Sequence, residues 1–232
     1  EIDGKPLAVG MLGEEIFVGV EGEQSVRTYS YTGELVGHLA APGTIGHPSD
    51  LAIDTVAGLV FVLDGIARDV KVFDAVTKTM VGTIASGQLH APAGVAVDRT
   101  RQQVLVSDYG SVQQYIDASI QFFSYASADF GARVTAISGE GRCSMFGGCT
   151  GGFSRPRGLA ADSTRVYLSD ALLAQVLIFD RASKALIGEY GSGDPAVSDL
   201  RTPSDVALAA DGTAYVTSTM TKSLVAFAGG AP

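Results

Sequence analysis

The apolar residues of this chain fall into short runs that are separated by turns rich in Asp and Gly. The runs are rich in β-branched and aromatic residues, and they therefore predict strands. Four of them repeat one pattern, in which a proline precedes a short apolar run, a turn and a second apolar run. The four prolines are Pro48, Pro92, Pro156 and Pro203, which are 44, 64 and 47 residues apart, and Pro6 lies 42 residues before the first of them. A period in the forties is typical of repeat architectures.

Each repeat predicts up to four strands. In the second repeat these are residues 50–53, 58–63, 69–73 and 79–84. The third strand of each repeat carries an aromatic residue, which we expect in the core between neighbouring sheets. The repeats lie near residues 5–46, 47–90, 91–153, 154–200 and 201–232, and we expect the 232 residues to form one domain.

The third repeat is longer than the others because it contains two insertions. One lies near residues 109–119, between the second and third strands, and the other covers residues 139–153, after the last strand. Loops on a repeat scaffold often carry binding residues. The fifth repeat predicts a third strand at Ser223–Phe227 and no fourth strand, so one strand edge is left exposed or needs a cap.

The repeated runs resemble a known motif. Read together as Pro-x-Gly-Val/Leu-Ala-x-Asp, Val-x-Val-Ser-Asp and Val-x-x-Phe-Asp, they are similar to the NHL repeat. The best copies are residues 92–98 with 104–108, and residues 156–162 with 166–170 and 176–180. The second repeat has Val62-Leu63-Asp64 in place of Val-Ser-Asp, while the first and fifth repeats diverge, with Gly19 and Ser218 near the expected Asp.

The resemblance covers essentially the whole chain. It implies an all-β fold, a β-propeller built from four-stranded blades. NHL propellers most often have six blades and five repeats are visible here, so rings of five or six blades both remain open. Propellers built from tryptophan-containing repeats are disfavoured, because the chain has no Trp.

Charge and hydropathy exclude two classes of partner. The formal net charge is -9, with 16 Lys and Arg against 25 Asp and Glu. A protein that binds the phosphate backbone needs a net or local excess of basic residues, so we expect no nucleic acid partner. No apolar stretch approaches the length of a membrane span, so we expect none.

The start of the chain and its cysteines suggest export. The chain begins at Glu1 and not at Met, which indicates either a removed leader or an excised piece of something longer. Cys143 and Cys149 lie in a Gly-rich loop and can close a small disulfide ring, which persists only in an oxidising compartment. Two reduced thiols in a cytosolic loop are the alternative. We expect a bacterial protein that is periplasmic or extracellular.

Aspartates recur at the strand ends of the repeats. Those that follow first strands are Asp54, Asp98, Asp162 and Asp211, and those that end second strands are Asp64, Asp108 and Asp170. They could serve as acid or base groups or as calcium ligands, or they could cap turns by accepting backbone N–H bonds. A single active site needs no copy in each repeat, so we expect turn caps.

Basic residues gather in the loops that enter the first strands. They are Lys5, His47, His90, Arg155, Arg157 and Arg201. The repeat logic places these loops at one end of the propeller channel, where the six residues would form a cationic mouth for an anionic ligand. The alternative is that these long side chains only solvate their loops.

Catalytic and metal signals are weak. His47 and His90 occupy similar loops. The resemblance implies a possible metal site there, because some NHL-type propellers are zinc-dependent lyases that use several His residues from such loops. Two ligands rarely suffice for zinc, and His38 is expected in the fourth strand of the first repeat, towards the rim. No nucleophile signature is present either. We therefore predict no metal, no cofactor and no catalytic residue.

The sequence favours a non-catalytic NHL-like propeller that acts as a protein-binding scaffold. Its expected surfaces are the cationic mouth and the insertion loops, whose candidate residues are Tyr109, Tyr115, Met145 and Phe146. One alternative is a metal-dependent lyase or hydrolase with its site in the channel, at His47 and His90. A second alternative is a subunit of a larger assembly, which pairs with another chain through the open strand edge at residues 223–232.

Overall fold

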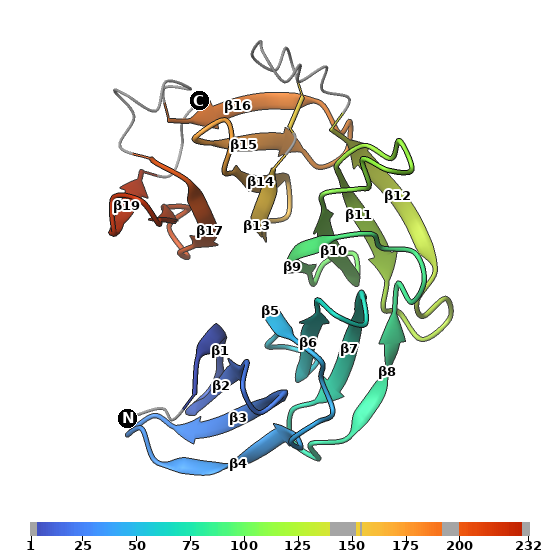
Figure 1. Ribbon diagram of the computed structural model, residues 1–232, viewed down its shortest axis with the longest axis vertical. Helices are drawn as coiled ribbons and strands as arrows, with labels where there is room; N and C mark the ends of the chain where they lie inside the picture. Colours follow the sequence, from blue (N-terminus) through green and yellow to red (C-terminus); the bar gives the residue numbers. More distant parts are fainter. Residues whose placement is uncertain (1–3, 140–151, 154, 192–199, 229–232) are drawn as a thin grey trace. The chain divides into compact units, whose positions relative to one another are not determined.

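The computed structural model describes residues 4–139, 152–153, 155–191 and 200–228, and the regular elements of this part of the chain are all strands. They form five sheets, four with four strands and one with three, and in each sheet the strands follow one another in sequence order (Figure 1). The prediction of an all-β fold built from β-propeller blades is confirmed. In the described part of the chain no helix is long and apolar enough to cross a membrane.

The first two sheets lie in the N-terminal part of the chain. The first consists of β1 (Pro6–Leu12), β2 (Glu15–Val20), β3 (Ser25–Ser30) and β4 (Leu35–Ala40). The second consists of β5 (Pro48–Asp54), β6 (Leu59–Asp64), β7 (Asp69–Asp74) and β8 (Met80–Ile84). The strands β5–β8 of the second sheet agree within about two residues with those predicted for the second repeat.

The third sheet consists of β9 (Pro92–Asp98), β10 (Gln103–Asp108), β11 (Ser119–Ser124) and β12 (Arg133–Ser138). The fourth consists of β13 (Pro156–Ala161), β14 (Arg165–Asp170), β15 (Gln175–Asp180) and β16 (Leu186–Tyr190). The fifth has only β17 (Pro203–Leu208), β18 (Ala214–Ser218) and β19 (Ser223–Phe227). The insertion predicted near residues 109–119 lies, as expected, between β10 and β11.

The chain divides into two compact units. Unit 1 comprises Glu1–Val104 and Phe123–Val134, and unit 2 comprises Leu105–Phe122 and Thr135–Pro232. The third sheet contributes residues to both units. The expectation of one domain, and of a ring of five or six blades, stays a prediction.

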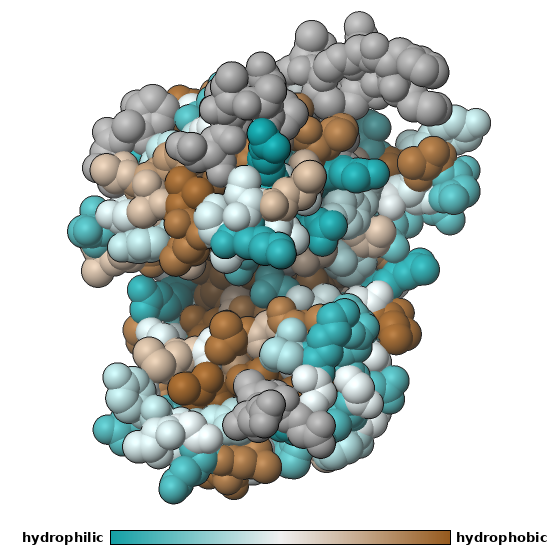
Figure 2. Space-filling view, turned by 60° about the vertical axis from the view of Figure 1, so that its left-hand side comes forward, coloured by the Kyte–Doolittle hydropathy of each residue, from teal (hydrophilic) through white to brown (hydrophobic). Residues whose placement is uncertain are grey.

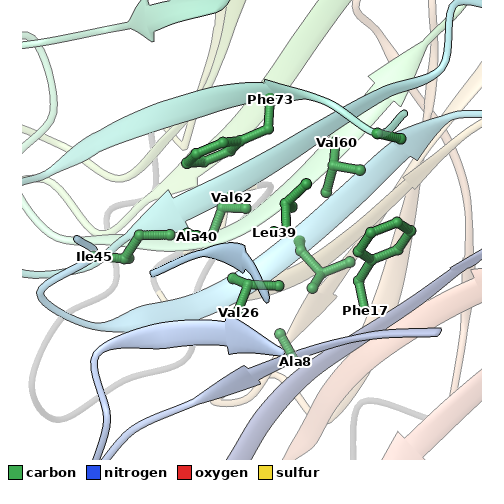
Figure 3. Close-up of a cluster of buried hydrophobic side chains, with 11 residues drawn as sticks. Ala8, Phe17, Val26, Leu39, Ala40, Ile45, Val60, Val62 and Phe73 are labelled. Atoms are coloured by element: carbon green, nitrogen blue, oxygen red, sulfur yellow. The ribbon is translucent and has the colours of Figure 1, made fainter. Parts of the chain in front are cut away.

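The core of unit 1 lies between the first and second sheets. Its buried side chains come from β1–β4, from the loop after β4 and from β5–β7, and Figure 3 shows that they interdigitate across the space between the strands. The cluster includes Phe17, Val26, Leu39, Ile45, Val60, Val62 and Phe73. The third-strand aromatics Phe73, Phe123 and Phe179 are buried in the core as predicted, whereas Tyr29 and Phe227 are only half-buried.

The core of unit 2 packs the fourth sheet against the fifth. Tyr167, Val176 and Ile178 of the fourth sheet form one buried cluster with Val206 and Val216 of the fifth. At the margin of this core the rings of Tyr190 and Phe227 stack with centroids 4.6 Å apart. One side of β19 is therefore packed against the fourth sheet.

Turns between strands are held by aspartate side chains. The carboxylate of Asp54 accepts the N–H groups of Val56 and Ala57, and that of Asp170 accepts those of Leu172 and Leu173. Corresponding bonds form at Asp64, Asp98, Asp108, Asp162 and Asp211. The prediction that the recurrent aspartates cap turns is confirmed.

Candidate functional site

Three of the loops that carry the predicted basic residues form hydrogen bonds with side chains at the ends of second strands. Asp64 at the end of β6 accepts the backbone N–H of His47 at 3.1 Å. Asp170 at the end of β14 accepts the N–H of Arg155 at 2.9 Å, and Ser218 Oγ at the end of β18 accepts that of Arg201 at 2.8 Å. The sequence pattern therefore correctly places these basic residues at equivalent ends of their sheets.

In unit 1 two of these basic residues share a carboxylate. Lys5 Nζ lies 2.8 Å from Glu21 Oε2, and His47 Nε2 lies 3.4 Å from Glu21 Oε1. The hydrogen bond from Lys5 lowers the pKa of Glu21, and the nearby His47 acts in the same direction. Glu21 offsets the positive charge that the sequence predicted for this part of the cationic mouth. His90, the third such residue in unit 1, is half-buried.

In unit 2 a tyrosine interacts electrostatically with two exposed arginines. Burial and the negative charge of the nearby Asp170 raise the pKa of the Tyr109 hydroxyl, whereas the positive charges of Arg157 and Arg155 and a hydrogen bond with Arg157 act in the opposite direction. Arg155 and Arg157 are both exposed, while Tyr109 is half-buried. We call Tyr109, Arg155 and Arg157 the arginine–tyrosine site. Two guanidinium groups beside a phenolic hydroxyl suit a carboxylate or another anionic group.

Immediately after Tyr109 the chain forms a tight hairpin, residues 111–116. Ser111 and Ile116 pair through two backbone hydrogen bonds, each of 2.9 Å. The hairpin is anchored at Gly110, whose N–H donates to the buried Asp108 carboxylate at 2.9 Å. Its tip exposes two apolar side chains, since Val112 is 88% and Tyr115 96% exposed. An apolar tip therefore adjoins Tyr109 of the arginine–tyrosine site along the chain.

Sequence reasoning missed one further residue of unit 2, Asp205. A Cβ added to Gly158 would lie only 2.1 Å from Asp205 Oδ1, so the carboxyl fits closely over this glycine. Asp205 as a whole is exposed, but removal of water around its carboxyl group raises the pKa to about 6, although the N–H of Val206 donates to the carboxylate at 2.8 Å. The signal in the sequence was an Asp in the fifth repeat, as in the second repeat at Asp50, where the third and fourth repeats have Gly.

The raised pKa of Asp205 predicts that the stability difference between the wild type and Asp205→Asn depends on pH. Its pKa is higher in the folded protein than the ordinary 3.8, so the folded state binds this proton more tightly and loses stability as the pH rises from about 4 to about 6. We expect Asp205→Asn to be more stable than the wild type by about 1 kcal/mol near neutral pH, because solvent screening reduces the effect. Urea titrations should show the difference vanish near pH 4. A difference that is equal at both pH values would contradict the assignment.

Several predicted residues are not brought together within one unit. Lys5, His47 and His90 lie in unit 1, whereas Arg155, Arg157 and Arg201 lie in unit 2. The predicted binding residues Met145 and Phe146, and the predicted disulfide partners Cys143 and Cys149, lie outside the described residues. Within the described ranges, no group of three or more His, Cys, Asp or Glu residues is placed to hold a metal ion.

No model of a known protein family matches the chain, and no curated protein matches it either. The NHL resemblance therefore rests on the repeated residues quoted above, and the fold class rests on the sheets of the structure.

Proposed function

We propose that this chain is an NHL-like propeller that acts as a protein-binding scaffold, and that its binding surface in unit 2 joins the arginine–tyrosine site to the tip of the 111–116 hairpin. The observation that carries the proposal is the approach of two exposed arginines to Tyr109, at the base of a hairpin that exposes Val112 and Tyr115. The partner is a polypeptide segment with acidic residues next to an apolar side chain.

The electrostatic part of the proposal follows from local charge. The chain as a whole is acidic, with a formal net charge of -9, so an exposed pair of arginines is a local exception. A bound carboxylate would gain charge-assisted hydrogen bonds from both guanidinium groups. In unit 1 the half-buried Glu21 lies beside Lys5 and His47, whereas the carboxylate near Arg155 and Tyr109 in unit 2, Asp170, is fully buried. These observations favour unit 2 for an acidic ligand.

The apolar part of the proposal follows from the hairpin. Exposed tyrosines are favoured at protein interfaces because they bury a large area at a low cost in side-chain entropy. The backbone bonds between Ser111 and Ile116 hold the tip in one conformation before any partner binds. A preformed loop loses less conformational entropy on binding than a flexible loop does.

The test is a selection of peptides from a random displayed library on the immobilised wild-type protein. We expect the selected peptides to contain acidic residues next to an apolar residue. The double variant Arg155→Ala/Arg157→Ala should bind them about tenfold more weakly, because each charge-assisted hydrogen bond contributes about 1.5–3 kcal/mol before solvent screening. Fluorescence anisotropy with a labelled selected peptide measures the affinity, which should also fall as the salt concentration rises.

The matched control is Arg133→Ala, which removes one exposed arginine from β12, at a site in unit 1. This variant should bind the selected peptides like the wild type. Selected peptides without acidic residues would contradict the proposal. Equal affinity for the wild type and the double variant would contradict it as well.

A further inference from the structure

Among the described residues the fifth sheet has three strands, whereas each of the other four sheets has a fourth. In these sheets the third strand pairs with a fourth, as β3 does with β4, β7 with β8, β11 with β12 and β15 with β16. Among the described residues β19 pairs only with β18 (Figure 1). The other side of β19 therefore corresponds to the side on which the third strand of each other sheet pairs with a fourth strand.

The backbone of β19 presents hydrogen-bonding groups on this open side. In the second and fourth sheets the last residue of the third strand donates across to the fourth: Asp74 N–H to Thr79 O at 2.9 Å, and Asp180 N–H to Ala185 O at 2.8 Å. Ala228 holds the equivalent position in the fifth repeat. Because backbone groups alternate in direction along a strand, Leu224 and Ala226 present their N–H and C=O groups on the same side.

The face of β19 that carries Leu224 is exposed, because no described sheet covers it. The residues equivalent to Leu224 are Val26, Val70, Ile120 and Val176, and all four are 0% exposed. Leu224 itself is 63% exposed. Tyr215 on the adjacent β18 is exposed too, whereas its counterparts Phe17, Phe61 and Tyr167 are buried. On the face drawn in Figure 2, hydrophobic side chains reach the surface among hydrophilic ones.

The existing fourth strands show which sequence fits such an edge. Three of them have two apolar residues, then Gly, a polar residue and an apolar residue: residues 35–39, 80–84 and 186–190. The last apolar residue is buried in each case, as Leu39, Ile84 and Tyr190. In the second and fourth sheets this residue lies directly opposite Val70 or Val176, the counterparts of Leu224. The glycines Gly82 and Gly188 lie opposite Val72 and Ile178, the counterparts of Ala226.

We propose that the open side of β19 is a docking site for an extended segment of another polypeptide, which adds to the fifth sheet as an antiparallel fourth strand. The segment has the pattern apolar, apolar, Gly, polar, apolar. Its last apolar side chain lies opposite Leu224 and its glycine opposite Ala226. Backbone hydrogen bonds supply affinity, and the apolar residue opposite Leu224 supplies specificity. This surface is independent of the arginine–tyrosine site.

The probe is a fluorescein-labelled peptide with the sequence of residues 78–86 of this chain, which contains the whole of β8. We expect saturable binding to the wild-type protein, measured by fluorescence anisotropy. The same peptide with Gly82→Pro serves as the control and should not bind, because proline removes the N–H that faces the third strand. Binding of the proline peptide with equal affinity would overturn the proposal.

Two protein variants test whether the peptide binds at β19. Ala226→Pro removes an N–H from the open side, and we expect about tenfold weaker binding; its matched control Ala226→Val keeps the N–H and should bind like the wild type. Leu224→Asp should also weaken binding about tenfold, since it places a charge opposite the apolar side chain of the peptide. Circular dichroism and thermal unfolding of Ala226→Pro should match the wild type, because prolines are tolerated on edge strands.

Two kinds of result with the protein itself would overturn the proposal as well. One is the absence of saturable binding to the wild type, or binding that neither Ala226→Pro nor Leu224→Asp weakens. The other is a wild-type dimer, detected by light scattering, that Ala226→Pro dissociates, since it would assign the edge to a second copy of this chain. Peptide binding should be unchanged in Arg155→Ala/Arg157→Ala, which separates this site from the arginine–tyrosine site.

Discussion

Replacement of Asp64 by alanine is expected to lower the free energy of unfolding by about 3–5 kcal/mol. The Asp64 side chain lies at the end of β6, and the residue is 1% exposed. Its carboxylate accepts the N–H groups of Gly46, His47, Ile66 and Ala67, and Lys71 Nζ lies 2.8 Å from Oδ2. Alanine would leave all these donors without the carboxylate, in a place that water reaches poorly.

The ionised form of Asp64 supplies this stability. Burial acts to raise the pKa of Asp64, but the hydrogen bonds from Lys71 and from backbone N–H groups outweigh it and hold the pKa below the ordinary range. A carboxyl with a lowered pKa stabilises the folded protein above its unfolded pKa, and this contribution is lost as the pH falls through the folded pKa. Urea unfolding followed by circular dichroism should therefore show the largest difference from the wild type near neutral pH.

The control for Asp64→Ala is Asp74→Ala in the same sheet. Asp74 also caps a turn, since it accepts the N–H groups of Val76 and Thr77, but these bonds are exposed to solvent. We expect Asp74→Ala to cost about 1 kcal/mol, because water replaces the lost bonds. Equal losses for the two variants would show that Asp64 acts only as a turn cap.

The strands were predictable from the sequence because their signals are local. Alternation of apolar residues and the aspartates at turns define where each strand begins and ends, and β19 has the bounds predicted for it, Ser223–Phe227. Turn capping by Asp54 or Asp170 involves residues two and three positions away. Such contacts need no knowledge of neighbouring sheets.

Burial was less predictable than strand position. Val9 follows the same repeat pattern as Leu51 and Val95, yet it is 69% exposed whereas they are 7% and 3% exposed. The first strands β1, β5 and β9 contact one another in order, so Leu51 and Val95 each have a preceding sheet to pack against. The repeat pattern gives the direction of a side chain, but its burial depends on which sheet covers it.

The individual residues of the candidate site were predicted from the sequence, but their proximity was not. Tyr109 and the arginines 155 and 157 were each named, but from separate arguments about an insertion and a loop. Their approach depends on how unit 2 packs residues almost fifty positions apart, and no local pattern reports it. The pairing of Lys5 and His47 with Glu21 was missed, although a carboxylate directly after β2 lies at the strand end where those loops are expected.

Replacement of Gly110 by alanine is expected to prevent the 111–116 hairpin from forming in its present conformation. The φ angle of Gly110 is 73°, in the left-handed region that costs other residues energy. A Cβ at this position would lie 2.2 Å from the carbonyl oxygen of Ile116 and 2.5 Å from that of Asp117. Both neighbours are backbone atoms, so the overlap cannot be relieved by a side-chain rotation. We expect a loss of roughly 2–4 kcal/mol in the free energy of unfolding.

The matched control is Gly87→Ala. Gly87 has nearly the same φ angle, 71°, but a Cβ there would meet no atom within 4 Å. Its cost should be about 1–2 kcal/mol, which is the conformational part alone. The difference between the two variants in urea unfolding therefore measures the steric overlap at Gly110.

Gly110→Ala also tests whether the hairpin contributes to binding. If the tip formed by Val112 and Tyr115 is half of the surface, the variant should bind the selected acidic peptides at least about tenfold more weakly, while Gly87→Ala binds them like the wild type. Normal binding by a folded Gly110→Ala protein would confine the surface to the arginine–tyrosine site. Weak binding by both glycine variants would instead indicate a general loss of stability, because Gly87 lies in unit 1, outside the unit that carries the hairpin.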